Sequence, residues 1–358
     1  MRTIDFYIIK KFLGTFFYAI ALLIVIVIVF DLSEKIDNFL KTKPSVYEIF
    51  FSYYLNFIPY FVNLFVYLFT FISVIFFTSK MASNTEIIAI LSNGISFGRL
   101  LRPYFIAAVF LSLMSFVLAN FVIPITNRKL QAFEDRYLHN PRSNRDTDIH
   151  MKLDPQTYAY VESFNATNNI GYKFSLEKIS DSGLYYKLTS EKVQWDSATG
   201  AWKAQNYYLR EFRGRDQVIE KGKEINLTLS LKPEEFTIKK DDLKTMNFIR
   251  LNEFIKEERM KGSKNVNTFL IEKYKRLADP FATLILTFIG VAVSSRKVRG
   301  GIGMHLGIGI TITFAYILFL QISTVFATMG NLSPIVAAWI PNIIFGLMAL
   351  FMIRLAPK

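Results

Sequence analysis

The sequence contains no cysteine, so it can form neither a disulfide nor a metal site with thiolate ligands. Its three histidines, His139, His150 and His305, are far apart, and we expect no metal site from them because metal ligands usually have characteristic spacings. The patterns GxxxxGK[ST], HExxH, GxSxG and CxxC are also missing. The sequence therefore has no recognisable motif of its own for nucleotide binding, metal-assisted hydrolysis, serine hydrolysis or redox chemistry.

Acidic and basic residues are missing from five long segments. A helix that spans a bilayer needs about 20 predominantly apolar residues, whereas buried helices of soluble proteins are usually shorter and have a polar face. The first three segments predict one span each, the fourth predicts one if Leu270 and Ile271 extend it, and the last predicts two, separated by the turn-forming residues 330–334. The segments are Phe12–Phe30, Ile49–Ser79, Pro103–Asn127, Pro280–Ser295 and Gly300–Ile353. The sequence therefore predicts a membrane α-helical bundle of six transmembrane helices.

Lysine and arginine are distributed unequally between the two sides of this predicted bundle. Segments 1–11, 80–102, 296–299 and 354–358 fall on one side and hold 11 of them, whereas the short loops on the other side hold Lys35, Lys41 and Lys43. The positive-inside rule then predicts that both termini are cytoplasmic and that the long segment between the third and fourth spans is outside. That segment mixes both signs of charge, which disfavours nucleic acid binding.

The long outer segment changes from helical to alternating patterns. Residues 157–164, 172–176, 184–195, 202–209 and 225–231 alternate polar with apolar side chains, and turn-forming residues separate them. This spacing predicts an all-β domain of the sandwich or barrel-like kind, and residues 247–261 predict a short amphipathic helix that leads back to the membrane. The predicted organisation is 1–125 for the first three spans, 126–270 for the outer domain and linker helix, and 271–358 for the last three spans.

A short amphipathic helix, at about residues 83–94, is predicted between the second and third spans. Ser83 is a candidate N-cap with Glu86 as its capping-box partner, and Asn93-Gly94 is typical of a helix end. Ile87, Ile90 and Leu91 form an apolar stripe between these ends. The helix is either an ordinary surface helix or a docking helix whose apolar anchors enter a groove of a cytoplasmic partner.

Two groups of basic residues lie at the predicted outer ends of the first and fourth spans, against the positive-inside bias. They are Lys35, Lys41 and Lys43 in one group, and Lys273, Lys275 and Arg276, with Asp279, in the other. Such side chains can simply extend toward the head-group region. They can also hold the phosphates of an anionic lipid through charge-assisted hydrogen bonds.

Several of these segments resemble the LptF/LptG (YjgP/YjgQ) family of lipopolysaccharide-export permeases. The match is to a cytoplasmic coupling helix, to the two ends of the third span, to a hairpin of the periplasmic domain, to the start of the fourth span and to the last span. The residues that carry it are, in that order, Thr85–Ser96, Arg102-Pro103 with Ala119–Pro124, Trp195–Trp202, Arg276–Ala282 and Ala337–Asn342. Residues Asp31–Leu40 are more similar to LptG than to LptF.

The resemblance implies a chain of the inner membrane of a Gram-negative bacterium, with a periplasmic β-jellyroll-like domain. It implies a heterodimer with an LptF-like paralogue, a cytoplasmic LptB-like ATPase dimer, periplasmic LptC-like and LptA-like jellyroll proteins, and lipopolysaccharide as the cargo. It implies no cofactor on this chain, since the partner ATPase would hold ATP and magnesium. Glu86 matches the acidic position of the coupling helix, Lys35 lies near a lysine associated with lipid phosphates, and Arg276 matches an arginine of the family.

Other functions are compatible with parts of this pattern. The main alternative is a membrane scaffold or mechanotransmission subunit of an ABC-type complex that has no cargo path. A membrane-embedded enzyme that acts on lipids, or a secondary transporter, would need ionisable residues within the spans, and the charge-free segments disfavour both.

Overall fold

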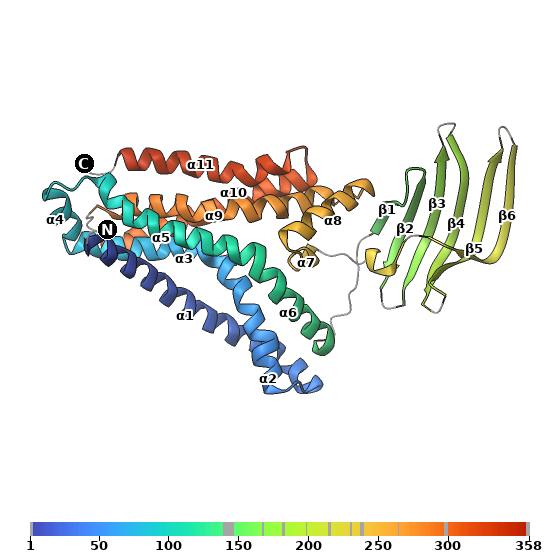
Figure 1. Cartoon of the computed structure of the whole chain (residues 1–358), viewed down its shortest axis with the longest axis horizontal. Helices are drawn as coiled ribbons and strands as arrows, with labels where there is room; N and C mark the ends of the chain where they lie inside the picture. Colours follow the sequence, from blue (N-terminus) through green and yellow to red (C-terminus); the bar gives the residue numbers. More distant parts are fainter. Residues whose placement is uncertain are drawn as a thin grey trace. The chain divides into compact units, whose positions relative to one another are not determined.

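The computed structural model describes residues 3–138, 147–166, 168–180, 183–197, 199–213, 216–229, 231–236, 240–263, 265–296 and 300–355. The chain divides into two compact units (Figure 1). One unit is helical and comprises residues 1–133 and 270–358. The other comprises residues 134–269 and contains a β-sheet.

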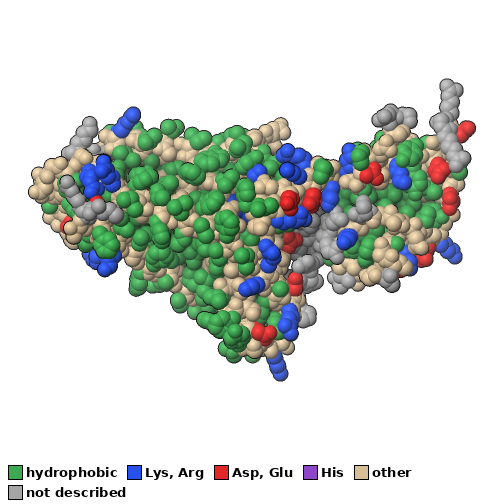
Figure 2. Space-filling view, viewed as in Figure 1, with side chains coloured by type: hydrophobic (Ala, Val, Ile, Leu, Met, Phe, Trp, Pro, Cys, Tyr) green, Lys and Arg blue, Asp and Glu red, His purple; other side chains and the backbone are tan. Residues whose placement is uncertain are grey.

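The helical unit contains six stretches that are long and apolar enough to cross a membrane. The stretches are α1 (Thr3–Thr42), α2 to α3 (Val46–Ser83), α5 to α6 (Phe97–Tyr137), α9 (Val266–Ser294), α10 (Gly301–Met329) and α11 (Pro334–Arg354). They confirm the six predicted spans, including the break between Met329 and Pro334. Figure 2 shows that hydrophobic side chains cover much of this unit, with Lys and Arg gathered toward its ends. Large apolar side chains such as Tyr18 and Phe30, each 73% exposed, would be unfavourable in water and suit the hydrocarbon of a bilayer.

Helix α1 is much longer than the charge-free segment that predicted it. The helix continues through Asp31 and Lys35 to Thr42, and Lys43 then adopts a left-handed φ of 48° before Pro44. A residue before proline is disfavoured in the helical conformation, which explains why the helix ends there. The charged residues that bound the apolar segment are therefore part of the helix rather than of a loop.

The spans that contain α3 and α5 are each interrupted by a π-helical segment. The first of these two spans runs through α2 (Val46–Glu48), the π segment η1 (Ile49–Tyr54) and α3 (Leu55–Ser83). The second runs through α5 (Phe97–Val117), the π segment η2 (Leu118–Val122) and α6 (Ile123–Tyr137). Short π segments are rare, and they mark places where helix geometry changes.

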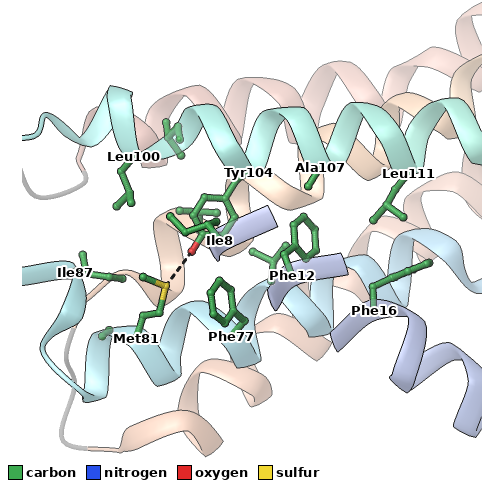
Figure 3. Close-up of a cluster of buried hydrophobic side chains, with 14 of the residues drawn as sticks. Ile8, Phe12, Phe16, Phe77, Met81, Ile87, Leu100, Tyr104, Ala107 and Leu111 are labelled. Atoms are coloured by element: carbon green, nitrogen blue, oxygen red, sulfur yellow. Dashed lines mark hydrogen bonds between the residues drawn. The ribbon is translucent and has the colours of Figure 1, made fainter. Parts of the chain in front are cut away.

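Two large apolar clusters of the described residues pack the helical unit, and α3 contributes to both. The first joins α1, α3 and α5 around Phe12, Met81 and Tyr104 (Figure 3). The second joins α3, α9, α10 and α11 around Phe71, Leu286, Tyr316 and Phe345. At Gly290 a Cβ atom would lie 2.9 Å from Val74 Cγ1, so the absence of a side chain permits the close approach of α9 to α3.

The second unit contains a six-stranded antiparallel sheet in the order β1-β2-β3-β4-β5-β6. The strands are β1 (Thr147–Lys152), β2 (Thr157–Asn165), β3 (Ile170–Ser180), β4 (Gly183–Asp196), β5 (Ala201–Arg213) and β6 (Asp216–Leu227). They confirm the predicted all-β domain inserted between the third and fourth spans. The described strands form one antiparallel sheet in which each strand pairs with the next along the chain, whereas a sandwich would have two sheets.

Three short helical elements complete this unit. They are the 3-10 helix η3 (Pro233–Phe236), α7 (Lys240–Leu243) and α8 (Phe248–Met260). Residues 231–236 cover one face of the sheet, where Trp202 Nε1 donates to the Leu231 carbonyl at 2.8 Å and Phe164 stacks on Phe236 at 4.6 Å between ring centroids. Asn247 caps α8, because its side chain accepts a hydrogen bond from the Arg250 N–H. The predicted amphipathic helix after the strands is thus confirmed.

In β2, β3, β4 and β5 the alternation of buried and exposed residues shifts by one position partway along the strand. The four shifts lie in one row of paired residues across the sheet. Buried residues change from odd to even positions in β2, between Val161 and Phe164, and the corresponding shift occurs in β3, β4 and β5. Lys173 and Asn206, which lie in this row, have φ values of 49° and 53°. Because these four strands shift at the same row, the pairing register between them is kept.

Candidate functional site

Helix α4 (Glu86–Ser92) lies at the end of the helical unit where the described chain begins and ends (Figure 1). The Tyr7 hydroxyl donates to Glu86 Oε2 at 3.4 Å, which places the start of α1 beside α4. The Arg296 guanidinium donates to the Leu355 carbonyl, so the connection between α9 and α10 also lies beside the C-terminal end of α11. One end of the bundle therefore brings together the segments that the sequence predicted to share a side.

The capping box predicted at the start of α4 is wrong. Ser83 is the last residue of α3, and α4 begins after Thr85, which has a left-handed φ of 60° and makes no side-chain cap. The reason is that Met81 and Ala82 are buried in the bundle, so the packing of α3 extends its helix past the expected boundary. A capping box forms instead at Ser45, whose hydroxyl accepts from the Glu48 N–H at 3.2 Å while Glu48 Oε2 accepts from the Ser45 N–H at 3.0 Å.

The apolar stripe of α4 faces the bundle. Ile87 is 1% exposed and packs in the cluster that contains Met81 and Leu100 (Figure 3), while Ile90 and Leu91 are half-buried against the same cluster. These side chains hold α4 on its own chain, so they are not the part of the helix that would enter the groove of a partner in the docking alternative. The outward face is formed by Ile88, Ala89, Ser92, Asn93 and Gly94. The predicted helix end is confirmed, because α4 stops at Ser92 and Gly94 has a φ of 78°.

Glu86 lies at the first position of α4 and is half-buried. Its carboxylate accepts from Tyr7 and from Asn84 Nδ2, the latter at 3.3 Å. Both donors are neutral, so these contacts orient the carboxylate without cancelling its charge. A carboxylate at the start of a helix is also stabilised by the exposed N–H groups there. Glu86 therefore presents a fixed negative charge beside the exposed face of α4.

An ion pair that the sequence did not reveal lies behind α4. Arg99 Nη1 and Nη2 donate to the two carboxylate oxygens of Asp5 at 2.8 and 2.7 Å. The side chain of Asp5 is 6% exposed, and that of Arg99 is 26% exposed. A small cavity beside the pair is lined by Ile4 of α1 and Ile90 of α4. The two partners are 94 positions apart, and no local pattern joins them.

The candidate lipid contacts on α1 differ in their surroundings. Lys35 Nζ pairs with Asp31 Oδ1 at 2.9 Å, contacts the hydroxyl of Tyr53 and lies 4.8 Å from the centroid of that ring. Tyr53 is fully buried, so Lys35 already has an internal environment of opposite charge and aromatic surface. Lys41 is exposed near the end of the helix.

The candidate lipid contacts on α9 also differ. Arg276 is 6% exposed and donates through Nε to Glu272 Oε1 at 3.3 Å, one turn earlier on the same helix. Lys273 and Lys275 are half-buried, and Lys273 Nζ lies 5.5 Å from the centroid of the Tyr274 ring. Lys35 thus contacts both its own helix and η1, whereas the carboxylate that Arg276 contacts belongs to α9 itself.

The sheet holds a hollow of about 1190 Å³. Its lining combines tyrosines (Tyr158, Tyr160, Tyr207 and Tyr208) with lysines (Lys152, Lys173, Lys187, Lys221, Lys223 and Lys261). Lys152 and Lys221 lie 5.3 and 5.0 Å from the ring centroids of Tyr158 and Tyr208. Glu177 and Glu191 also line the hollow, and Lys187 pairs with Glu177 at 2.6 Å, so the lining combines aromatic surface with ammonium groups that carboxylates neutralise in part.

The described histidines have local partners within the protein. His150 packs on Tyr160 with 4.7 Å between ring centroids, and His305 Nδ1 lies 2.7 Å from Ser79 Oγ. His139 lies outside the described residues. In the part of the chain that the structure describes, no three His, Asp or Glu side chains gather as a metal site requires.

Comparison with known proteins gives two results. Residues 6–355 match the family described as lipopolysaccharide export system permease LptF/LptG. An uncharacterized protein of Aquifex aeolicus (strain VF5) is 25% identical over 302 residues, which are 80% of this chain and 80% of that protein. The family match covers nearly the whole chain, both the helical unit and the sheet, and does not distinguish LptF from LptG.

Proposed function

Because the chain belongs to the LptF/LptG family of lipopolysaccharide export permeases, we propose that it is one permease half of an ABC exporter. In this proposal the exporter extracts lipopolysaccharide from the inner membrane and passes it to a periplasmic bridge of jellyroll proteins. The family is one of transmembrane permeases, so the chain is a transmembrane subunit, and ATP hydrolysis would take place on a separate LptB-like dimer. The other half of the permease would be an LptF-like paralogue, with this chain in the LptG position.

The geometry of α4 carries the coupling part of this proposal. Its inner face is fixed to α1, α3 and α5 through Ile87, Ile90 and Leu91, so a force on the outer face moves the helix together with the bundle. Its outer face offers the Glu86 carboxylate, the exposed Ile88 and the turn at Gly94. An apolar side chain beside a fixed charge is a suitable docking surface for a partner, since the first contributes buried area and the second contributes orientation. We assign contact with the ATPase to this face and place it, with both termini, in the cytoplasm.

The basic residues at the outer ends of α1 and α9 support the cargo part of the proposal. Lys41, Lys273 and Lys275 are our candidates for direct contact with lipid phosphates. Lys35 and Arg276 are candidates of a second kind, because each would have to exchange an internal carboxylate for a phosphate. The tyrosine- and lysine-lined hollow of the sheet would receive the same amphipathic, anionic molecule after it leaves the membrane.

The test of coupling is Glu86→Ala in the complex of the full chain with its paralogue and ATPase. We expect ATP hydrolysis to continue while ATP-dependent release of lipopolysaccharide falls by about tenfold, a typical size for a coupling free energy between sites. Glu34→Ala is the matched control, since it removes an exposed carboxylate from the opposite end of α1. Normal export by Glu86→Ala would show that the coupling role is wrong.

The alternative role, a mechanotransmission subunit with no cargo path, requires a different readout. In that case lipopolysaccharide would not crosslink to Lys41, Lys273 or Lys275 replaced by a photoreactive residue. Export would also be unaffected by Lys41→Ala and Lys275→Ala. We expect crosslinks at these positions and reduced export.

A further inference from the structure

We propose that the Asp5–Arg99 ion pair is a pin that transfers the displacement of α4 to α1, and that α1 carries it to the opposite end of the bundle. Asp5 and Arg99 are thus positioning residues for transport. This inference rests on the proposed function, because it assumes that a partner moves α4.

The pin has the geometry of a directional connection. The two terminal nitrogens of the Arg99 guanidinium each donate to one carboxylate oxygen of Asp5, at 2.8 and 2.7 Å, which fixes the angle as well as the distance between the two side chains. Apolar packing such as that of Ile8 and Phe12 against α5 holds the helices together without a directional bond, whereas the bidentate pair adds one. Arg99 lies in the first turn of α5, three residues after the Ser96 cap that closes the turn from α4. Movement of α4 therefore reaches Arg99 through a short, capped turn.

The location of the charges supports a positioning role over a stabilising one. Asp5 lies in the first turn of α1, where helix N–H groups favour an anion, whereas Arg99 lies in the first turn of α5, where a cation is disfavoured. A buried ion pair often adds little to stability compared with apolar residues of the same size. The cost of burying this ion pair, and of placing a cation at the start of α5, is understandable if the pair is needed to hold α1 in a fixed position relative to α4 and α5.

Helix α1 is suited to carry the displacement along the whole bundle. It is one uninterrupted helix of 40 residues without proline, which corresponds to a length of about 60 Å. The two spans connected directly to α4 are different, since each is interrupted by a π segment, η1 or η2. Asn56, in the first turn of α3, donates through Nδ2 to the Phe51 and Ser52 carbonyls of η1, and Asn120 of η2 donates through Nδ2 to the Phe116 carbonyl of α5. Because π segments allow a helix to bend locally, α1 is the stiffest of the three paths.

The far end of α1 offers a place where this displacement acts. There Lys35 and Asp31 contact Tyr53 of η1, and Phe39 packs on Tyr53 and on Phe133 of α6. A shift or rotation of α1 would therefore act on the π segment η1 in one span and on α6, which follows η2, in the other. The pin at Asp5, at one end of α1, is thereby connected with the candidate lipid contact Lys35 at the other.

The experiment uses the full chain, assembled with its paralogue and ATPase in proteoliposomes that contain lipopolysaccharide. Asp5→Asn removes the charge with little change of shape, and the exchanged pair Asp5→Arg/Arg99→Asp restores opposite charges. Arg102→Gln is the matched control, because Arg102 is an exposed arginine one turn further along α5. ATP hydrolysis and lipopolysaccharide release are measured on the same preparations.

We expect Asp5→Asn to lower release by about tenfold while ATP hydrolysis stays within about twofold, which is the size expected for a contacting pair that couples two elements. The exchanged pair should regain most of the release, and Arg102→Gln should behave as the parent chain. Unchanged release in Asp5→Asn would overturn the proposal. A parallel loss of release and hydrolysis that the exchanged pair does not restore would also overturn it. If Asp5→Asn fails to assemble, release by the exchanged pair tests the proposal instead: regained release supports it, and absent release overturns it.

A second readout follows the displacement itself. Since the chain has no cysteine, spin labels can be placed at Leu40→Cys on α1 and Ile125→Cys on α6, both exposed, without first removing cysteines from this chain. We expect nucleotide trapping to shift the distance between the labels in the parent and in Arg102→Gln, and not in Asp5→Asn. A shift that persists in Asp5→Asn would refute the pin. If the parent shows neither export nor a shift, the proposed function fails and the pin fails with it, whereas failure in Asp5→Asn alone leaves the proposed function intact.

Discussion

Replacement of Ile87 by alanine tests whether α4 is held on the bundle by its inner face. The change removes three carbon atoms from a side chain that is 1% exposed. At about 0.8 kcal/mol for each buried carbon group, the loss is about 2.4 kcal/mol before any cavity is counted, and measured values for such changes are about 2–5 kcal/mol. Because α4 is short and is anchored mainly through this face, we expect the cost to appear as local opening of α4.

Hydrogen exchange of the α4 amides in the full chain is the appropriate assay. The Ala89 N–H bonded to the Thr85 carbonyl and the Asn93 N–H bonded to the Ala89 carbonyl report on the helix. A loss of about 2.4 kcal/mol corresponds to roughly 60-fold faster exchange when opening is local. In the assembled complex the same variant should still allow ATP hydrolysis but should export lipopolysaccharide poorly, since a loosened α4 would move without the bundle.

Ile88→Ala is the matched control, because it removes the same atoms from the neighbouring residue, which is 53% exposed. We expect it to leave exchange of the α4 amides within a few tenths of a kcal/mol of the parent, as is usual for surface substitutions, and to weaken association with the ATPase. The opposite pattern, with fast exchange in Ile88→Ala and unchanged exchange in Ile87→Ala, would refute the assignment of the two faces of α4.

Three further predictions concern other parts of the molecule. Trp202→Phe should lower the free energy of unfolding of the sheet by about 1–3 kcal/mol in denaturant titrations, because the buried Leu231 carbonyl loses its donor; an unchanged midpoint would contradict this. Gly290→Val should destabilise the helical unit by about 1–3 kcal/mol in thermal unfolding, since its Cβ would press on Val74, whereas Gly303→Val, where a Cβ meets open space, should be tolerated. Hydrogen bonding by the Thr157 side chain, and by the N–H groups of Gln156 and Thr157, lowers the pKa of Asp154 below 3.8. A carboxyl group whose pKa is lowered in the folded state stabilises the fold above about pH 3.8, the usual pKa of Asp, and this stabilisation is lost as the pH falls through the lower pKa of the folded state. Asp154→Asn should therefore lower the free energy of unfolding near neutral pH and make no difference in strong acid.

The six spans could be predicted because each depends on a property that is local and additive. A charge-free segment of sufficient length indicates a span whatever it packs against, and the turn at residues 330–334 divides the last segment without reference to the rest of the fold. The strands were equally visible as alternating segments. What a charge-free segment could not show is where the helix ends, since α1 continues through Asp31 and Lys35 to the residue before Lys43.

The errors at the candidate site came from tertiary packing. Ser83-x-x-Glu86 has the pattern of a capping box, yet the buried Met81 and Ala82 keep Ser83 in α3. The stripe of Ile87, Ile90 and Leu91 was identified correctly as one face of a helix, but periodicity does not say whether that face meets the same chain or a partner. The Asp5–Arg99 pair and the π segments depend on contacts between distant residues or on small changes of helical geometry, for which the sequence has no local signal.

Purification of the tagged chain from its native membrane in mild detergent, with mass spectrometry of everything that stays bound, shows whether the chain is a subunit of an ABC exporter. We expect three companions: a second six-span permease, a cytoplasmic ATPase and lipopolysaccharide. Recovery of the chain alone, or with other enzymes and without an ATPase, would contradict the exporter and the coupling role of α4.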